Sequence, residues 1–381
     1  MVTKQTQHIN GIEIKVCILT SAHPPFNRRI FHKQAKTLAK AGYEVTLIAQ
    51  HDRDEVVDGI KIVALPRPKN RLWRMLATWR VLRLALRQKA DVYHFHDPEL
   101  LPAGLLLKLI IKGKVIYDVH EDYPKAILTK HWLPSSVRMP VALLFNFLEK
   151  WAASRLDYTI VTTDDIARNF ESTRKVATIK NYPVLERIEL SPMHDTEQPT
   201  LIYAGGISQG RGIDEIIQAM AYLDSSRNAR LVLYGKFKIE SYQEIMQGVK
   251  GFDRVEYRGW IEPEQMCQKI SEATIGIVCY RPEPNHINAM PTKLFEYMLA
   301  GIPVIASNFP RWKEIAEGNN CGLTVNPLDP ADIARAIEYL LDHPDDARQM
   351  GENGRKSVLE KYNWEAESKK LLEIYERLLS V

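Results

Sequence analysis

An apolar run of strand length, a polar loop, a helical pattern and a second apolar run open this chain. The first run covers residues 14–20, the loop 21–27, the amphipathic helical segment 28–41 and the second run 43–49. Strand, crossover helix and strand at this spacing are typical of a parallel sheet covered by helices. The order therefore predicts a doubly wound α/β fold, in which ligands collect at the C-terminal ends of the strands.

The alternation occurs twice, because a polar, proline-containing segment between residues 181 and 199 separates two α/β series. A chain of 381 residues also exceeds what one hydrophobic core usually supports. We therefore expect two Rossmann-like domains, spanning residues 1–190 and 191–362, followed by a C-terminal helix over 363–381.

The first loop lacks a G-x-G-x-x-G pattern, which disfavours a nicotinamide or flavin dinucleotide. It presents His23, Asn27, Arg28 and Arg29, which either face a substrate or are solvated residues of the first helical turn. His96 and His120 follow two later strands and fall at the edge where sites form. A lone histidine is more often structural, but two at one edge favour a function for at least one.

Residues 285–305 read as a polar loop, a short helix and a buried strand. Pro291 suits the first helical turn, and Lys293 adds a positive charge to the N-terminal dipole, which attracts phosphate. Glu296 follows one turn later and can accept hydrogen bonds from sugar hydroxyls. The combination fits a nucleotide diphosphate; the alternative is an ordinary capped helix.

Two further loops of the second series follow the same logic. Gly205 and Gly206 end a strand and allow close approach of a ligand to the backbone. Arg211, in the same loop, suits a phosphate group. Gly235 and Lys236 repeat the arrangement of strand and glycine.

Arg67–Lys89 contains eight basic residues and no acidic one, with apolar residues at helical spacing. Residues 1–190 hold 30 Lys and Arg against 19 Asp and Glu, whereas the remainder holds 21 against 28. The basic segment suits an anionic membrane surface, and the alternative is a core-packed helix with a basic solvent face. A nucleic-acid role is disfavoured because no nucleic-acid-binding motif accompanies the segment.

Neither a secretion signal nor a membrane span is expected, since no signal-like segment precedes Ile14 and no apolar run reaches about 20 residues. The four cysteines match no metal-ligand spacing, and we expect reduced thiols. These features predict a cytoplasmic protein, either free or peripheral on the inner face of the cytoplasmic membrane.

Several ordered motifs resemble one family. Residues 291–305 (PTKLFEYMLAGIPVI) are similar to the donor motif that reads P-x-K-x-x-E-Y in the GT-B glycosyltransferases of retaining family four, the glycosyl transferases group 1. Further similarity covers nearly the whole chain and lies in Gly205-Gly206 with Arg211-Gly212, Tyr234-Gly235-Lys236, Arg258-Gly259-Trp260-Ile261, His96–Pro102 and Asp118–Glu121.

The resemblance implies two Rossmann-like domains facing across a cleft, with the acceptor on the first domain and the nucleotide sugar on the second. It also implies that the last helix, around Trp364, returns to the first domain. Glu296 would hold the ribose, Arg211 and Lys293 the diphosphate, and His120 would lie near the transferred sugar. The remaining residues assigned by this reading are, for the donor, Gly205, Gly206, Gly235, Lys236, Trp260, Ile261, Asn288, Met290, Pro291, Thr292 and Leu294, and, for the acceptor, His23, Asn27, Arg28 and His96.

Two positions depart from the family pattern. Asn288 stands where a second glutamate usually contacts the donor sugar, and Ile207 lies near the position of a usual arginine. The resemblance still implies sugar transfer from a UDP- or GDP-sugar, with retention, to a glycan or lipid-linked acceptor in envelope or exopolysaccharide assembly. No Asp-x-Asp metal motif is present, and neither metal nor cofactor is expected.

Two other readings stay open. One is an inactive nucleotide-sugar-binding partner of a transferase. The other is a nucleotide-sugar epimerase, which the spacing of Lys293 and Glu296 disfavours.

Overall fold

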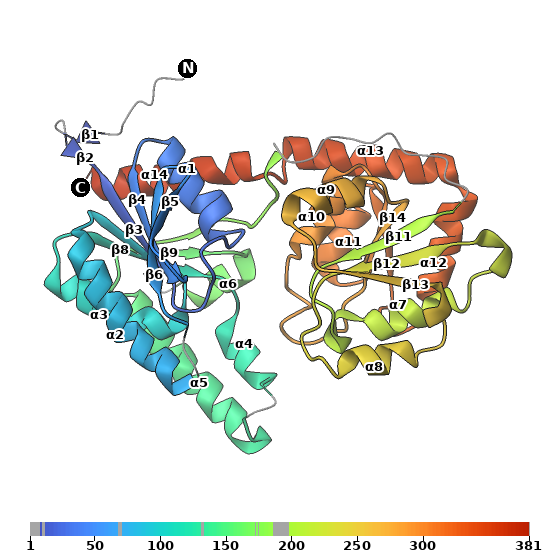
Figure 1. Cartoon of the computed structure of the whole chain (residues 1–381), viewed down its shortest axis with the longest axis horizontal. Coiled ribbons are helices and arrows are strands. Elements are labelled where there is room, and N and C mark those ends of the chain that lie inside the picture. Colours follow the sequence, from blue (N-terminus) through green and yellow to red (C-terminus); the bar gives the residue numbers. More distant parts are fainter. Residues whose placement is uncertain are drawn as a thin grey trace. The chain divides into compact units, whose positions relative to one another are not determined.

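A computed structural model describes residues 8–9, 12–67, 71–130, 133–171, 173, 175–185 and 198–380. The chain divides into two compact units, one comprising the chain up to Asn181 together with the residues from Glu365 onward, the other Tyr182–Trp364. The predicted boundary at residue 190 and residues 186–197 of the predicted linker (181–199) lie outside the described residues. Figure 1 shows the elements of each unit.

The first unit contains an eight-stranded sheet in the order β10-β9-β8-β7-β3-β4-β6-β5. All neighbours in it are parallel except β5 and β6. Apart from β5, the strands follow one another in chain order outward from β3 on both sides. The sheet is therefore doubly wound and has its switch point between β3 and β7. The strands are β3 (Lys15–Leu19), β4 (Glu44–Gln50), β5 (Glu55–Val57), β6 (Ile60–Leu65), β7 (Val92–Phe95), β8 (Lys114–Val119), β9 (Tyr158–Val161) and β10 (Val176–Thr178).

Helices connect these strands, and α3 packs against both α2 and α5. The predicted helix over residues 28–41 begins as a π-helix at Ile30–Ala35 and continues as α1. A short hairpin, β1 (His8–Ile9) and β2 (Ile12–Glu13), precedes the sheet. The helices are α1 (Lys36–Lys40), α2 (Arg71–Gln88), α3 (Leu101–Ile110), α4 (Tyr123–Leu128), α5 (Ser135–Ala153), α6 (Asp164–Asn169) and α14 (Trp364–Leu379).

The second unit contains a fully parallel sheet in the order β13-β12-β11-β14-β15-β16. Numbered from its own first strand, this is the 3-2-1-4-5-6 order of dinucleotide-binding folds, with its switch point between β11 and β14. The strands are β11 (Thr200–Ala204), β12 (Arg230–Tyr234), β13 (Val255–Gly259), β14 (Ile275–Val278), β15 (Val304–Ser307) and β16 (Gly322–Val325).

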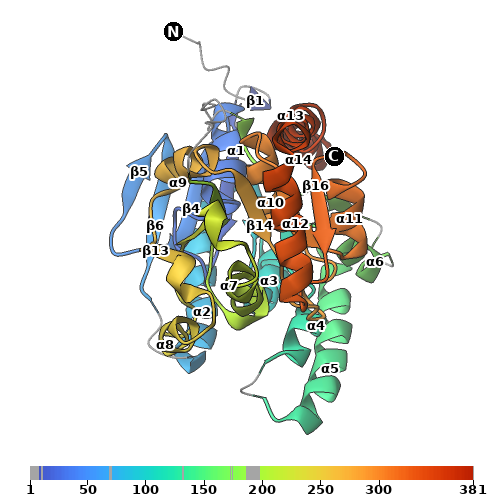
Figure 2. The ribbon, with the colours of Figure 1, turned by 90° about the vertical axis from the view of Figure 1, so that its right-hand side faces the viewer.

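Seven helices of the described chain cover this second sheet, and α7 and α12 lie side by side in the turned view (Figure 2). A core of buried aliphatic and aromatic side chains, Trp312 and Tyr297 among the largest, fills the space between sheet and helices. The helices are α7 (Ile213–Met220), α8 (Tyr242–Gln247), α9 (Pro263–Ser271), α10 (Thr292–Leu299), α11 (Pro310–Ala316), α12 (Pro330–Asp342) and α13 (Pro344–Glu360).

The structure confirms the predicted fold class of two parallel α/β sheets. The C-terminal helix α14 belongs to the first unit, as expected: the Tyr375 hydroxyl lies 2.8 Å from His94 Nδ1, and Glu367 accepts a hydrogen bond from the backbone N–H of Lys180. Within the described ranges, no helix has both the length and the apolarity needed to cross a bilayer.

Candidate functional site

Loops at the switch point of the second sheet gather two cations around one aromatic ring. Tyr280 lies two residues after β14, and Arg211 lies in the loop between β11 and α7. The guanidinium carbon of Arg211 is 4.3 Å from the centre of the Tyr280 ring, and Lys293 Nζ is 5.4 Å from the same centre. Two like charges sharing one ring repel each other, so the arrangement favours an anion beside them.

The position of Lys293 depends on its aromatic and backbone neighbours. Its Nζ lies 3.7 Å from the centre of the Tyr203 ring, and the residue is buried at the first turn of α10. Gly205 has φ +145°, and a Cβ there would come within 2.6 Å of the Lys293 Nζ. Glycine at this position therefore leaves room for the ammonium group directly after β11.

Arg211 is held differently from its neighbour Arg281. An Nη1 of Arg211 donates to the Tyr280 hydroxyl, and in the described part of the chain its buried Nε has no hydrogen-bond partner. Arg281, by contrast, is paired with Glu215 at 2.6 Å and with Asp214 at 3.4 Å. Of these two arginines, Arg281 is thus the one whose charge is already paired with carboxylates.

The helix that carries the donor candidates begins one residue later than predicted. Pro291, expected in the first turn, directly precedes α10, so the first helical residue is Thr292. Glu296 lies one turn after Lys293 and is half-buried. The side chain of Leu294 belongs to the hydrophobic core, whereas Met290 packs at its margin.

The other donor candidates lie on separate loops. Trp260 is half exposed, and Lys236 Nζ sits 4.7 Å from the centre of its indole. Ile261 packs against the core, and Gly235 accepts a hydrogen bond from the Tyr257 hydroxyl through its carbonyl. Gly206 borders open space, since a Cβ there would approach only Lys238, at 3.9 Å. Asn288 lies in the turn before α10.

Sequence reasoning missed Tyr203 and Tyr280 because tyrosines at strand ends usually belong to the core. Their position at or just after the ends of the two strands beside the switch point was the available signal. His286 was also missed as a neighbour of this site: its ring lies 5.1 Å from that of Tyr280, and burial lowers its pKa.

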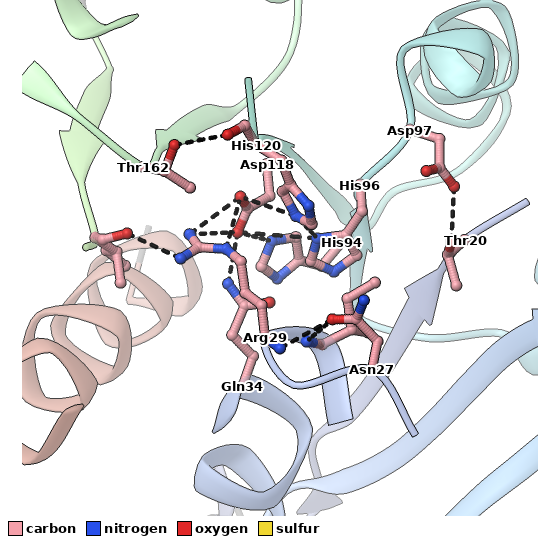
Figure 3. Close-up of polar contacts among 12 residues, drawn as sticks. Thr20, Asn27, Arg29, Gln34, His94, His96, Asp97, Asp118, His120 and Thr162 are labelled. Carbon is pink, nitrogen blue, oxygen red and sulfur yellow. Dashed lines mark hydrogen bonds and ion pairs between the residues drawn. The ribbon is translucent and has the colours of Figure 1, made fainter. Parts of the chain in front are cut away.

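In the first unit, Asp118 at the end of β8 is the centre of a buried polar cluster (Figure 3). Arg29 contacts both of its carboxylate oxygens at 3.0–3.2 Å, and Gln34 donates a further hydrogen bond. Arg29 was expected to face a substrate or the solvent; this expectation is wrong, because the guanidinium is buried against Asp118 and the carbonyl of Ile179. Arg28 is exposed.

Histidines from three strands meet beside this ion pair. His96 Nδ1 lies 3.0 Å from His120 Nε2 (Figure 3). The rings of His120 and His23 stack with their centres 5.5 Å apart. His94 Nε2 lies 3.4 Å from Asp118 Oδ2, and His94 Nδ1 lies 2.8 Å from the Tyr375 hydroxyl oxygen. The structure thus brings together His23, His96 and His120, which the sequence placed on separate loops.

Burial and neighbouring charges set the protonation of this cluster. Burial lowers the pKa of His120 to about 4, with Asp118 opposing the shift and Arg29 adding to it. Burial, together with His94, holds the pKa of His96 well below its usual range. Burial alone would raise the pKa of Asp118, but Arg29 and the hydrogen bond from His94 outweigh it, so that this pKa is well below the usual range. His96 and His120 are therefore both neutral beside an ionised Asp118.

The candidate ligands His94, His96 and Asp118 have donor atoms within 4.8 Å of one another. The guanidinium of Arg29 already supplies positive charge to both oxygens of Asp118. A dication placed at these atoms would be repelled by Arg29 at short range. This cluster therefore offers no good metal site.

Asp97 fixes the loop after β3. Its Oδ2 accepts hydrogen bonds from the backbone N–H of Ser21 at 2.6 Å and from the Thr20 hydroxyl at 2.7 Å (Figure 3). Asn27 Oδ1 accepts hydrogen bonds from the backbone N–H groups of Arg29 and Ile30, and its Nδ2 lies 3.3 Å from His23 Nδ1. Asn27 therefore stabilises the turn that leads into the following helix and orients His23.

Comparison with known proteins agrees with these features. Residues 28–181 match the family described as Glycosyltransferase Family 4, and residues 186–357 match Glycosyl transferases group 1. An uncharacterized glycosyltransferase of Methanocaldococcus jannaschii is 22% identical over 400 residues, covering 95% of this chain and 98% of that protein.

Solved structures show the same fold. Sucrose-phosphate synthase of Thermosynechococcus elongatus superimposes with a TM-score of 0.79 at 20% identity, covering 97% of this chain and all of that one. Anabaena HepE in complex with UDP-glucose gives a TM-score of 0.71 at 15% identity, covering 97% of this chain and all of that one.

Proposed function

This chain is a glycosyltransferase of the glycosyl transferases group 1 family with the GT-B fold, and we propose that it transfers a hexose from a UDP- or GDP-sugar to an acceptor hydroxyl, with retention and without a metal. The observation that carries the proposal is the convergence of Arg211 and Lys293 on the Tyr280 ring beside the start of α10. Cleavage of the donor leaves a nucleoside diphosphate, whose developing charge such preorganised cations stabilise.

Each donor residue takes a role from its surroundings. Arg211, which has an uncommitted Nε, and Lys293, held over Tyr203, bind the diphosphate. The N–H groups at the start of α10 assist through the helix dipole. Glu296, one turn further on, accepts hydrogen bonds from the ribose. The half-exposed indole of Trp260 stacks beside the base.

We assign the acceptor to the first unit, at the edge that carries His23, His96 and His120. Because His120 stays neutral, it can accept a hydrogen bond from the acceptor hydroxyl and orient it. The acceptor hydroxyl attacks the anomeric carbon on the face from which the diphosphate leaves, and this same-face attack gives retention. The proton of that hydroxyl passes to the leaving diphosphate oxygen. Asp118 and Arg29 act as positioning residues, since they hold the histidines and do not reach an acceptor from their buried place.

The acceptor we propose is lipid-linked, in envelope or exopolysaccharide assembly on the cytoplasmic face of a membrane. Support comes from the basic segment Arg67–Lys89, which would meet anionic lipid. Residues 68–70 of that segment lie outside the described residues. Its remaining charged positions include Arg80, Arg83 and Arg87, all of which are exposed on α2.

A second candidate is a nucleotide-sugar-binding protein without transferase activity. Asn288 stands where the family pattern has a carboxylate, and Ile207, near the position of the usual arginine, is uncharged and fully buried. Incubation with labelled UDP- and GDP-sugars separates the two candidates. Donor hydrolysis without acceptor supports the transferase, whereas nucleotide binding with no turnover, under any acceptor tested, supports the second candidate.

A further inference from the structure

Helix α5 turns apolar side chains outward. Leu143, Leu144 and Phe147 are 61%, 60% and 64% exposed, whereas the buried face of the helix consists of Ala142, Glu149 and two further alanines. We call the exposed set the α5 apolar face; it comprises Val137, Met139, Val141, Leu143, Leu144, Phe147, Leu148 and Trp151. Exposed apolar patches of this kind mark interaction sites on water-soluble proteins.

The charged side chains of helices α2, α3 and α5 are mostly basic. Helices α2, α3 and α5 are adjacent, since α3 packs against the other two, and together they hold eight Arg and Lys and one acidic residue. That acidic residue, Glu149, is buried and accepts a hydrogen bond from the Tyr117 hydroxyl. No carboxylate of these three helices therefore reaches the described outer surface.

Aromatic and basic side chains meet at the C-terminal end of α5. The guanidinium of Arg155 lies 4.0 Å from the centre of the Trp151 ring, and Trp151 is 43% exposed. On α2, Trp79 is exposed next to Arg80 and Arg83. Tryptophan beside arginine is the combination found where a protein meets the headgroup region of a bilayer.

We propose that the outer face of α2, α3 and α5 docks onto a bilayer that contains anionic phospholipid. The α5 apolar face enters the boundary between headgroups and acyl chains, and the arginines of α2 meet the lipid phosphates. The inference extends the membrane part of the proposed function, on which it rests, by adding a docking surface formed by three helices of the first unit. Because docking needs no bound donor, it can fail or succeed independently of sugar transfer.

The positive charge of this face favours an anionic membrane over a second copy of this chain as its partner. In a symmetric dimer the same patch occurs on both partners, so the basic side chains of α2 and α5 would lie against each other. Like charges brought together across an interface are unfavourable. Anionic lipid matches the sign of the patch, and each basic residue near such a surface adds to the attraction.

Flotation of the full chain with extruded vesicles tests the proposal. The wild-type protein should bind equimolar phosphatidylcholine and phosphatidylglycerol vesicles and bind pure phosphatidylcholine about tenfold or more weakly. Replacing Leu143, Leu144 and Phe147 together by serine should weaken binding about 30-fold or more, because three large apolar side chains no longer leave water. Replacing Arg80, Arg83 and Arg87 by glutamine should weaken binding to the mixed vesicles on the order of 100-fold.

The matched control removes equally exposed apolar side chains from the second unit. Tyr222, Ile239 and Ile245 are 61–66% exposed, and their triple serine variant should bind vesicles within about twofold of the wild type. Thermal melting checks that all variants fold. The proposal is overturned if the wild type does not float, if the α5 variant floats as well as the control, or if sedimentation shows a dimer that only the α5 variant dissociates.

Discussion

The buried pair of Arg29 and Asp118 allows a large effect on stability to be predicted from geometry. Both residues are almost completely buried, and the guanidinium Nε and Nη2 reach the two carboxylate oxygens at 3.0–3.2 Å. Arg29→Met keeps the volume roughly constant but leaves the carboxylate buried without its cation. Breaking a buried pair in this way costs about 3–5 kcal/mol, and we expect that loss at pH 7.5.

The effect depends on pH with a definite sign. In the wild type, Arg29 and His94 outweigh burial and lower the pKa of Asp118. The carboxylate therefore stabilises the folded state above its unfolded pKa of about 3.9, and this contribution is lost only as the pH falls through the lowered pKa. In Arg29→Met, burial acts without the arginine and favours a proton on Asp118. The difference between the two proteins should shrink between pH 7.5 and pH 5.

Hydrogen exchange can measure this loss in the first unit alone. A loss of 3 kcal/mol, the lower limit above, corresponds to about 150-fold faster exchange of the β8 amides, provided that these amides exchange through opening of the unit. The amides of β12, in the other unit, should exchange as in the wild type. Arg28→Met provides the matched control, because Arg28 is the exposed neighbour in sequence. Equal β8 exchange in the two variants would refute the reasoning.

Three further predictions concern the two candidate sites. Arg211→Ala should lower kcat/KM about 100-fold or more in a transfer assay, as for other single electrostatic stabilisers, whereas Arg335→Ala on the exposed face of α12 should leave it unchanged. Gly212→Ala should destabilise the second unit by more than about 2 kcal/mol in thermal melting, because φ is +69° and the new Cβ would lie 1.8 Å from the carbonyl oxygen of Cys279. The imidazole of His120 should remain neutral at pH 6 in a nuclear magnetic resonance titration, since its pKa is about 4; a midpoint near the usual 6.5 would contradict the burial described above.

Local sequence patterns were sufficient to predict the two α/β series, although β16 at the edge of the second sheet was not predicted. Apolar runs of strand length bounded by glycine or polar residues recur through the chain, and the strands predicted over 14–20 and 43–49 lie within one residue of β3 and β4. The short elements β5, α4, α6 and α8 were missed, because three to six residues carry too little periodicity to register as a helix or strand. Pro140 would suggest a helix start by its type, but α5 begins at Ser135 and the proline lies inside it.

The ion pairs and aromatic platforms could not be predicted in the same way. Arg29 and Asp118 are 89 positions apart, and only the folded sheet shows that the ends of β8 and the first loop meet. The mostly apolar sequence of the β8 segment marks it as a buried strand, but it does not reveal that an arginine pairs with Asp118. The same holds for Tyr203 and Tyr280, whose ring faces are shared with Lys293 and Arg211 only after folding.

The most direct test of diphosphate binding at Arg211 and Lys293 is calorimetric titration of UDP and GDP against the wild type and the double variant Arg211→Met, Lys293→Met, with uridine and guanosine as controls. The wild type should bind at least one diphosphate, and that one far more tightly than its nucleoside. The double variant should lose about 100-fold or more of the diphosphate affinity while its nucleoside affinity stays unchanged, since charged hydrogen bonds contribute about 1.5–3 kcal/mol each. Equal diphosphate affinity in the two proteins would contradict the assignment of these two cations.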